Sequence, residues 1–218
     1  MTCKPISLLQ LLILGLILAA GLPGWVSAER SQELFRLCVA CHGTQGEGRT
    51  ELGAPAIAGL PEWYVAAQLE KFRHGVRGSH PQDTAGMRMR PMARSLPTEN
   101  DVQAVAQYVA TLPLQTPPRT LTGNLASGAQ QYQLCLACHG PDGQGNQQLG
   151  APPLIISNDW YLLRQLQNLK QKIRGADAPR DPTGAMMQPI ASTLSEQAMQ
   201  KLMWENAARF FRLLSTPW

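Results

Sequence analysis

Two copies of a five-residue motif contain the side chains with the clearest chemistry in this sequence. A cysteine, two other residues, a second cysteine and a histidine occur at 38–42 and again at 135–139. Two thiols three positions apart on a forming helix can each add to one vinyl group of a haem, and the adjacent histidine then lies under the iron. Each motif therefore predicts one covalently attached c-type haem and one of its axial ligands. The anchors would be Cys38, Cys41, Cys135 and Cys138, and the ligands His42 and His139.

Cysteine pairs at this spacing also occur in zinc knuckles and in thioredoxin-like redox sites. A structural zinc site gathers four ligands in one cluster, whereas the two motifs here lie 97 residues apart. A redox dithiol has no need of a histidine after its second cysteine, and both motifs have one. The fifth cysteine, Cys3, lies at the extreme N-terminus, so no disulfide framework is predicted. Haem attachment is the favoured interpretation.

The two motifs belong to an internal repeat. Shifting the sequence by 97 residues places 52–55 (Leu-Gly-Ala-Pro) on 149–152, Trp63-Tyr64 on Trp160-Tyr161, and Arg77 on Arg174. The chain is therefore predicted to be a duplicated domain. Its first copy would span residues 29–116 and its second 123–218, joined by a linker at 117–122 that continues a proline-rich stretch.

The apolar pattern within each copy predicts helices. In the first copy we expect helices at 31–40, leading into the haem motif, at 61–75, and from Thr98 to the residue before Pro113. Apolar residues in the second of these recur at spacings of 4, 3 and 4, as they do in the second copy. Long alternation typical of β-strands is absent from the sequence. The predicted fold is all-α, with two tandem domains of three helices, each wrapped around a covalent haem.

The N-terminal segment resembles an export signal. Residues 1–28 contain one lysine, an apolar run, a Gly/Pro turn and the small-residue ending Val-Ser-Ala. We expect a signal peptide cleaved after Ala28; the alternative is an uncleaved anchor, which would attach the protein to the membrane. Either alternative places the remaining chain in the periplasm. Residues 29–116 have nine basic and nine acidic side chains, and residues 117–218 have nine and six, an excess too mild to indicate a nucleic-acid partner.

An iron that shuttles electrons needs a second axial ligand, for which methionine is usual in cytochromes c. A one-residue insertion makes the repeat offset 98 in this region, where Met89 aligns with Met187, each one residue before x-Pro. This is the one position with methionine in both copies, so these two are the predicted ligands. Met92 is the rival in the first copy. His74 and His80 have no counterparts in the second copy and are predicted to be surface residues.

The paired motifs and their surroundings resemble the dihaem c4-type cytochromes c. The resemblance rests on the two C-x-x-C-H-G-x-x-G-x-G stretches, the Leu-Gly-Ala-Pro segments, the Tyr-x-x-x-Gln-Leu pattern and the methionine before the final helix. It implies two class I cytochrome c domains in tandem. It also implies a periplasmic electron carrier that takes electrons from a quinol-oxidising bc complex and passes them to a terminal haem-copper oxidase.

The same resemblance implies roles for residues around each haem. The carbonyls of Pro55 and Pro152 would accept a hydrogen bond from the histidine ligand of their own domain. Arg77 and Arg174 would pair with haem propionates; the alternative for each is an arginine exposed to solvent without a special role. Tyr108 matches the aromatic residue that packs on the haem in the final helix; its counterpart is Glu205 at offset 97, or Phe210 if the last helix is longer.

The leading prediction is an electron carrier and not an enzyme, because no acid-base or nucleophile constellation is evident. The alternative is the cytochrome subunit of a flavoprotein or other dehydrogenase, for example a sulfide-oxidising one, or a dihaem enzyme. A peroxidase must free one coordination position on iron, which two matched methionines argue against. A haem-based gas sensor would need an open iron and an output domain, and neither is evident.

Overall fold

The computed structural model describes residues 23–121 and 125–200, and the side chains of 28–121 and 128–200. These residues form helices and loops, with no β-strand among them and only two isolated bridges, at Arg49–Ala54 and Asn146–Ala151. The first half contains α2 (Pro23–His42), η1 (Thr50–Leu52), α3 (Glu62–Arg73), α4 (Thr84–Arg94) and α5 (Glu99–Thr111). The second half contains α6 (Leu125–Tyr132), α7 (Leu136–His139), η2 (Gln147–Leu149), α8 (Asp159–Lys170) and α9 (Pro182–Thr193). The all-α fold is confirmed.

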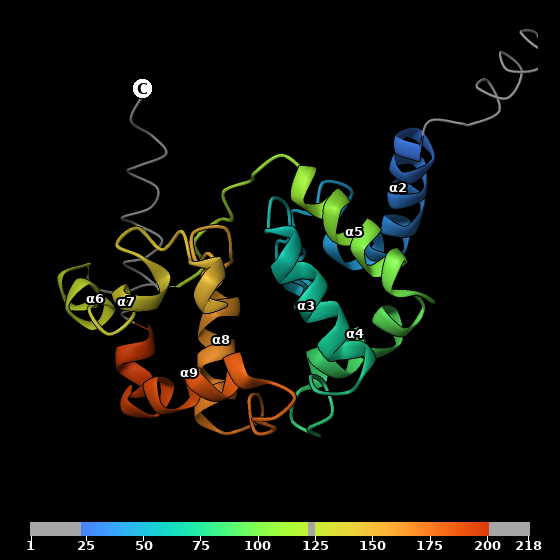
Figure 1. Ribbon diagram of the computed structural model, residues 1–218. Coiled ribbons are helices and arrows are strands. Elements are labelled where there is room, and N and C mark those ends of the chain that lie inside the picture. Colours follow the sequence, from blue (N-terminus) through green and yellow to red (C-terminus); the bar gives the residue numbers. More distant parts are fainter. Residues whose placement is uncertain (1–22, 122–124, 201–218) are drawn as a thin grey trace, which may run out of the picture.

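The repeat predicted from the sequence is visible in the local structure of both halves (Figure 1). Gly53 and Gly150 end the two 3-10 helices with φ of 63° and 64°, a conformation that glycine adopts without steric cost. Asp83 and Asp181 are the N-caps of α4 and α9, and each carboxylate accepts a hydrogen bond from the backbone N–H three residues later. Equivalent sequence positions therefore form equivalent turns.

Helix α5 packs against α2 and α3 to form the core of the first domain. It begins with a complete capping box, in which Thr98 and Asp101 each bond the other's backbone N–H. The rings of Phe35 on α2 and Tyr108 on α5 lie 5.0 Å apart at an interplanar angle of 49°. The aromatic residue predicted to face the haem from the final helix is thus fixed by contact with the helix that ends in the first motif. The second-domain counterparts, Glu205 and Phe210, lie outside the described residues.

Each domain contains, among its described residues, a helix that the sequence pattern does not predict. Helices α4 and α9, which carry the candidate methionines, contain Pro91 and Pro189 in their interiors. An interior proline removes one helical hydrogen bond and usually ends a helix, so the three-helix expectation was wrong at this point. The aspartate N-caps stabilise these helices at their starts. The helix expected at 61–75 is also shorter, because Pro61 has the extended ψ of 138° and acts as the N-cap.

Most of the expected signal peptide lies outside the described residues, whereas the expected linker is described up to Leu121. Helix α2 begins at Pro23 and continues through Ala28 without a break, while residues 1–22 and 122–124 lie outside those described. No helix from Pro23 onwards, in the part of the chain described, combines the length and apolar character needed to cross a membrane. The end of the linker is held by the second domain, since Asp159 accepts hydrogen bonds from the N–H groups of Thr120 and Leu121 at 2.8 and 2.9 Å.

The two domains meet along α3 and α8, which face one another in the middle of the molecule (Figure 1). A buried hydrogen bond of 2.7 Å from the Ala56 N–H to Asn158 Oδ1 joins the first domain to the N-cap of α8. Further polar contacts link α3 to Arg174, in the loop that follows α8, and to Asp181, the N-cap of α9. These interdomain contacts lie beside the candidate functional site described next.

Candidate functional site

The histidine of the first motif is buried and held in one orientation. His42 is the last residue of α2 and is 7% exposed. Its Nδ1 lies 2.8 Å from the carbonyl oxygen of Pro55, and because a carbonyl only accepts, Nδ1 donates the proton. Burial lowers the pKa of His42, although the hydrogen bond to Pro55 opposes this. The ring is therefore neutral at pH 7, with the lone pair of Nε2 available to a metal.

The second motif repeats this arrangement with little change. His139 ends α7 and is 5% exposed, and its Nδ1 lies 2.9 Å from the carbonyl oxygen of Pro152. Burial again lowers the histidine pKa. The hydrogen bonds implied for Pro55 and Pro152 are thus both present in the structure. They select the same tautomer in both domains, as is usual for a histidine that binds a metal through its other nitrogen.

The first cysteine of each motif has an environment opposite to that of the attacking thiol in a redox dithiol. Burial, and secondarily the neighbouring thiol, raises the pKa of Cys38 to about 11, and the same causes raise the pKa of Cys135 to about 11. The attacking thiol of a thioredoxin-like pair needs a lowered pKa. Among the residues that the structure describes, no three His, Cys, Asp or Glu side chains converge as a metal cluster would require. Neither alternative considered for the motif is favoured by this geometry.

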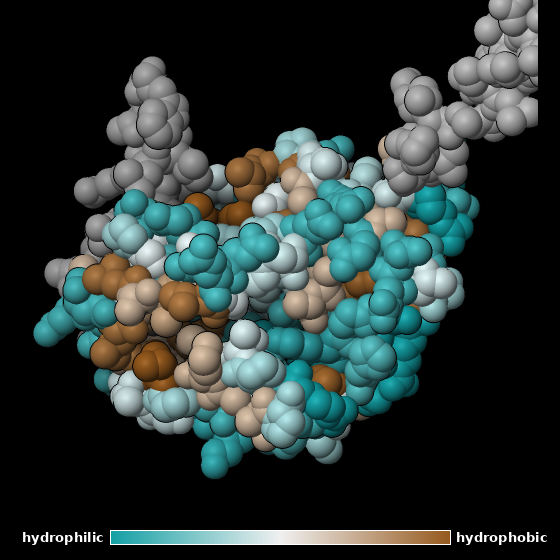
Figure 2. Space-filling model, in the orientation of Figure 1, coloured by the Kyte–Doolittle hydropathy of each residue, from teal (hydrophilic) through white to brown (hydrophobic). Residues whose placement is uncertain are grey.

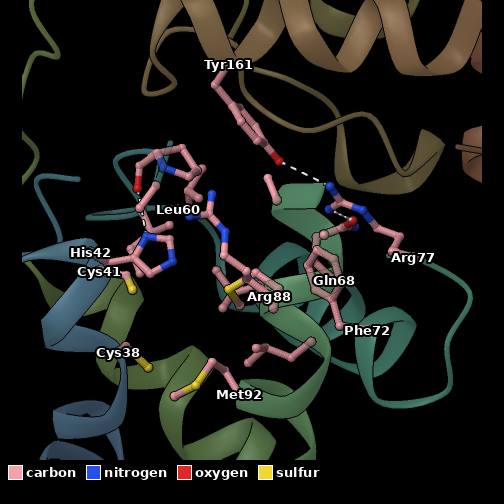
Figure 3. Close-up of a pocket in the computed structure, with 18 of the residues that line it drawn as sticks. Cys38, Cys41, His42, Leu60, Gln68, Phe72, Arg77, Arg88, Met92 and Tyr161 are labelled. Carbon is pink, nitrogen blue, oxygen red and sulfur yellow. Dashed lines mark hydrogen bonds between the residues drawn. The ribbon is translucent and has the colours of Figure 1, made fainter. Parts of the chain in front are cut away.

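An apolar cavity adjoins the first motif (Figure 3). Cys38, Cys41 and His42 line one side of it, and the α4 residues Met89 and Met92 also line it. Leucine, valine, phenylalanine and alanine side chains from α3, α5 and the loop around Pro55 supply much of its apolar wall. The cavity extends to the second domain, where Tyr161 and Gln165 of α8 complete the lining. The loop and helices of one domain thus bring together anchors, histidine and methionine that are distant in sequence.

The two methionines that align in the repeat are more buried than the other candidate methionines. Met89 and Met187 are partly buried and pack against the cores of their own domains. Met87, Met92 and Met186 are 47%, 38% and 60% exposed. Met92 nevertheless lines the cavity together with Met89. The repeat-matched pair therefore remains the predicted ligand pair, with Met92 as the rival to be tested.

Arg77 and Arg174, for which the family resemblance implies pairing with haem propionates, lie at the domain interface. Arg77 donates to Gln68 in its own domain at 2.8 Å and to Gln165 in the other at 3.0 Å. Arg174 repeats this with Gln165 at 2.9 Å and Gln68 at 3.2 Å. Figure 3 shows Arg77 between Gln68 and Tyr161, which it also contacts. Gln68 and Gln165 are the glutamines of the repeated Tyr-x-x-x-Gln-Leu pattern, but their contact with the two arginines was not predicted from the sequence.

An ion pair between the domains was also missed. Lys71 on α3 lies 2.6 Å from Asp181, the N-cap of α9. Burial raises the pKa of Asp181, but the hydrogen bond and charge of Lys71 outweigh it and hold this pKa below its ordinary value. Burial lowers the pKa of Lys71, whereas the hydrogen bond and charge of Asp181 oppose this. The Lys71 ammonium donates to both the Asp181 carboxylate and the Thr183 hydroxyl, which stabilises the ionised pair. No local pattern links residues 110 positions apart.

The described residues fit a covalently bound haem. The cavity is apolar and has thiols, a neutral imidazole and a thioether on its lining. The Nε atoms of Arg77 and Arg174 are buried and have no hydrogen-bond partner, although buried donors are nearly always paired. Two guanidinium groups at one interface favour an anionic group beside them, and carboxylate propionates have that charge.

Comparisons with known proteins give the same two-domain pattern. A family model described as Cytochrome c matches residues 28–113 and residues 125–203. A cytochrome c4 from Thiocapsa roseopersicina is 33% identical over 171 residues, or 74% of this chain and 81% of that protein. A thiosulfate dehydrogenase electron acceptor from Thiomonas intermedia is 31% identical over 183 residues, or 79% and 78%. The structure of reduced cytochrome c4 from Pseudomonas stutzeri has the same fold, with a TM-score of 0.65 and 24% identity over 83% of this chain and 97% of that chain.

Proposed function

Because the chain belongs to the cytochrome c family, in the dihaem c4-type form that binds two haem c groups covalently, we propose that it is a periplasmic carrier of electrons to a terminal haem-copper oxidase. The proposed donor is a quinol-oxidising bc complex, as the resemblance to c4-type cytochromes implies. The observation that supports a carrier is the repetition of one buried, tautomer-selected histidine in each domain, with a matched methionine. The protein would carry out no substrate chemistry of its own.

We assign the anchoring of each cofactor to the cysteines of each motif, and its axial ligands to His42 with Met89 and to His139 with Met187. When bound, each haem supplies an iron that exchanges one electron, and methionine ligation favours the ferrous form. Pro55 and Pro152 keep each imidazole turned so that Nε2 is free, which would retain the ligand in both oxidation states. Met89 and Met187 are held by packing against the domain cores.

The interdomain contacts support function as one unit with two electron-accepting sites. Arg77 and Arg174, each bonded to glutamines of both domains, hold the two halves in one arrangement. The first cavity already includes residues of the second domain in its lining. Under this proposal, the buried guanidinium groups neutralise the propionates where the two halves meet. The protein thereby keeps the distance between its two sites constant.

Exposed leucines at matched positions support contact with redox partners. Leu37 and Leu134 precede the two haem motifs, and Leu52 and Leu149 belong to the two 3-10 helices. All four are between 37% and 51% exposed. Figure 2 shows apolar surface gathered on the second domain. Exposed apolar patches commonly mark interaction sites. Here the four exposed leucines lie beside the residues that would hold a haem.

Electron transfer with purified partners tests the carrier function. The holoprotein should be reduced by a bc complex supplied with quinol, and the reduced holoprotein should be oxidised by a haem-copper oxidase, both followed by absorbance. Omitting either membrane complex is the matched control. Turnover of a small-molecule substrate by the purified holoprotein without either complex would contradict the carrier function.

A second candidate is an electron acceptor for a dehydrogenase, and one comparison favours it. The relative from Thiomonas intermedia is named as the electron acceptor of a thiosulfate dehydrogenase. The same absorbance assay distinguishes the two donors. Faster reduction by thiosulfate and its dehydrogenase than by quinol and the bc complex would favour the second candidate. Oxidation by the haem-copper oxidase is expected in both cases.

A further inference from the structure

A lysine of the first domain reaches the helix of the second domain that carries Met187. The Lys71 ammonium on α3 lies 2.6 Å from Asp181 Oδ1 and 2.9 Å from Thr183 Oγ1. The Lys71 side chain is 14% exposed and that of Asp181 is 1% exposed. The contact is therefore a largely desolvated ion pair, and not one of the surface pairs that contribute little.

Asp181 determines where α9 begins. Its carboxylate accepts a hydrogen bond of 2.9 Å from the Gly184 N–H, and Pro182 occupies the first helical position. Met187 lies six residues after this N-cap, on the second turn of the helix. Lys71 binds the same oxygen, Oδ1, that caps the helix. The first domain thus contacts the second at the point that sets the position of its candidate methionine.

The contact has no equivalent in the other direction. At the repeat offsets, Lys71 corresponds to Asn168 and Asp181 corresponds to Asp83. Asp83 caps α4 in the same way, with a hydrogen bond of 3.0 Å from the Gly86 N–H. Within residues 23–121 and 125–200, however, no lysine or arginine forms an ion pair with Asp83. The N-cap of the second-domain methionine helix is thus held by an ion pair from the first domain, whereas the described residues place no such ion pair on the N-cap of the first-domain methionine helix.

Replacing Lys71 by an uncharged residue would destabilise the folded protein around Asp181. Asp181 Oδ2 is already buried without a hydrogen-bond partner, so without the lysine a buried carboxylate would lose its principal countercharge. Removing one partner of a buried ion pair is strongly destabilising because the other charge is left uncompensated. The simplest relief is movement of the start of α9 toward water, which would also move Met187.

We propose that Lys71 is a positioning residue for the axial methionine of the second haem, supplied across the domain interface. This proposal rests on the assignment of Met187 as a ligand under the proposed function. It makes ligation in the second domain dependent on correct docking of the first, and ligation in the first domain independent of the second. The repeat provides an internal control because Asp83 is the same cap without the lysine.

Lys71→Met in the ferric holoprotein tests the proposal. The sulfur-to-iron charge-transfer band, followed against temperature in a Met89→Ala background, reports Met187 alone. We expect the equilibrium constant for methionine loss to rise by about tenfold or more, given the cost of an uncompensated buried charge. Hydrogen exchange at the first-turn amides of α9 should also rise, while the amides of α4 exchange at the wild-type rate.

Asp181→Asn, which keeps an oxygen for the Gly184 cap, is the second variant. In a protein that already has Asp181→Asn, adding Lys71→Met should change the equilibrium constant for methionine loss little further. Asp83→Asn should leave the Met187 band unchanged. An unaltered band and unaltered exchange in Lys71→Met, with Met187→Ala losing half of the wild-type band, would overturn the positioning role. If Met187→Ala keeps the whole band, the ligand assignment fails, and the positioning proposal fails with it.

Discussion

Arg77 of the first domain donates a hydrogen bond of 3.0 Å to Gln165 of the second domain. In the opposite direction, Arg174 of the second domain donates one of 3.2 Å to Gln68 of the first. Each arginine also bonds the glutamine of its own domain. The four side chains form a closed set in which every glutamine oxygen accepts from both guanidinium groups. A duplicated sequence has thus formed a nearly symmetric interface from one pair of positions used twice.

Arg77→Lys should weaken this interface. Lysine offers a single ammonium that cannot reach both glutamines in the geometry of a guanidinium fork. Since hydrogen bonds to charged groups contribute roughly 1.5–3 kcal/mol each, we expect a loss of about 2 kcal/mol in the free energy of unfolding. Guanidinium denaturation of the holoprotein measures it. Arg88→Lys is the control, because the exposed Arg88 makes one bond to a backbone carbonyl; equal losses in both variants would contradict the prediction.

Met89→Ala and Met187→Ala should each remove half of the sulfur-to-iron charge-transfer band. Each variant should also open one iron to carbon monoxide. The physical reason is loss of the thioether ligand, which leaves one coordination position free. Absorbance and carbon monoxide titration of the ferric and ferrous protein check both effects. Met92→Ala and Met186→Ala, at exposed positions, should leave both signals unchanged. Band loss in Met92→Ala together with its retention in Met89→Ala would show that Met92 is the ligand.

Asp101 should make a pH-dependent contribution to stability. Hydrogen bonds from Thr98 and Arg30 lower the pKa of Asp101. A carboxyl with a lowered folded-state pKa stabilises the protein above its unfolded value of about 3.9, and this stabilisation is lost as the pH falls through the folded value.

Asp101→Asn should therefore cost about 1 kcal/mol at pH 7, the usual effect of losing a capping contact. The difference from wild type should begin to shrink as the pH falls below about 3.9, and it should disappear once the pH is below the lowered pKa of the folded state. Thermal unfolding across this pH range measures it. A constant difference from pH 7 to pH 3 would contradict the prediction.

Electron transfer to the oxidase should slow as salt is added, because the second domain has the net positive charge of the chain. Nine basic and six acidic residues lie at 117–218, against nine and nine at 29–116. Attraction to an acidic partner is screened at 0.15 M ionic strength, where the Debye length is about 8 Å.

Lys172→Glu should reduce the rate at low salt more than Arg36→Glu, a matched change at an exposed residue of the first domain. Lys71 and Lys170 are unsuitable probes because one is in the interdomain ion pair and the other donates to the Leu194 carbonyl. Stopped-flow oxidation at several salt concentrations measures the effect. A rate independent of salt, or a larger loss in Arg36→Glu, would place docking elsewhere.

Local sequence patterns were sufficient for most of the individual helices. The spacing of apolar residues predicted α3, and the Thr98 cap with the following Pro113 predicted α5. The histidine-proline contacts followed from the family resemblance. Helices α4 and α9 were missed because an interior proline normally ends a helix. Asp83 and Asp181 cap these helices through their side chains, and this capping was visible only once the backbone was placed.

The cofactor and the presence of two domains could be predicted from the sequence alone, and the axial ligands of each iron stay predictions made from it. These properties depend on short spacings such as C-x-x-C-H and on a repeat that aligns with itself. Only the tertiary structure decided that Gln68 meets Arg174 and that Lys71 meets Asp181. Contacts across more than 100 residues depend on how one folded domain is oriented against the other. That orientation results from the packing of whole surfaces, which no local periodicity encodes.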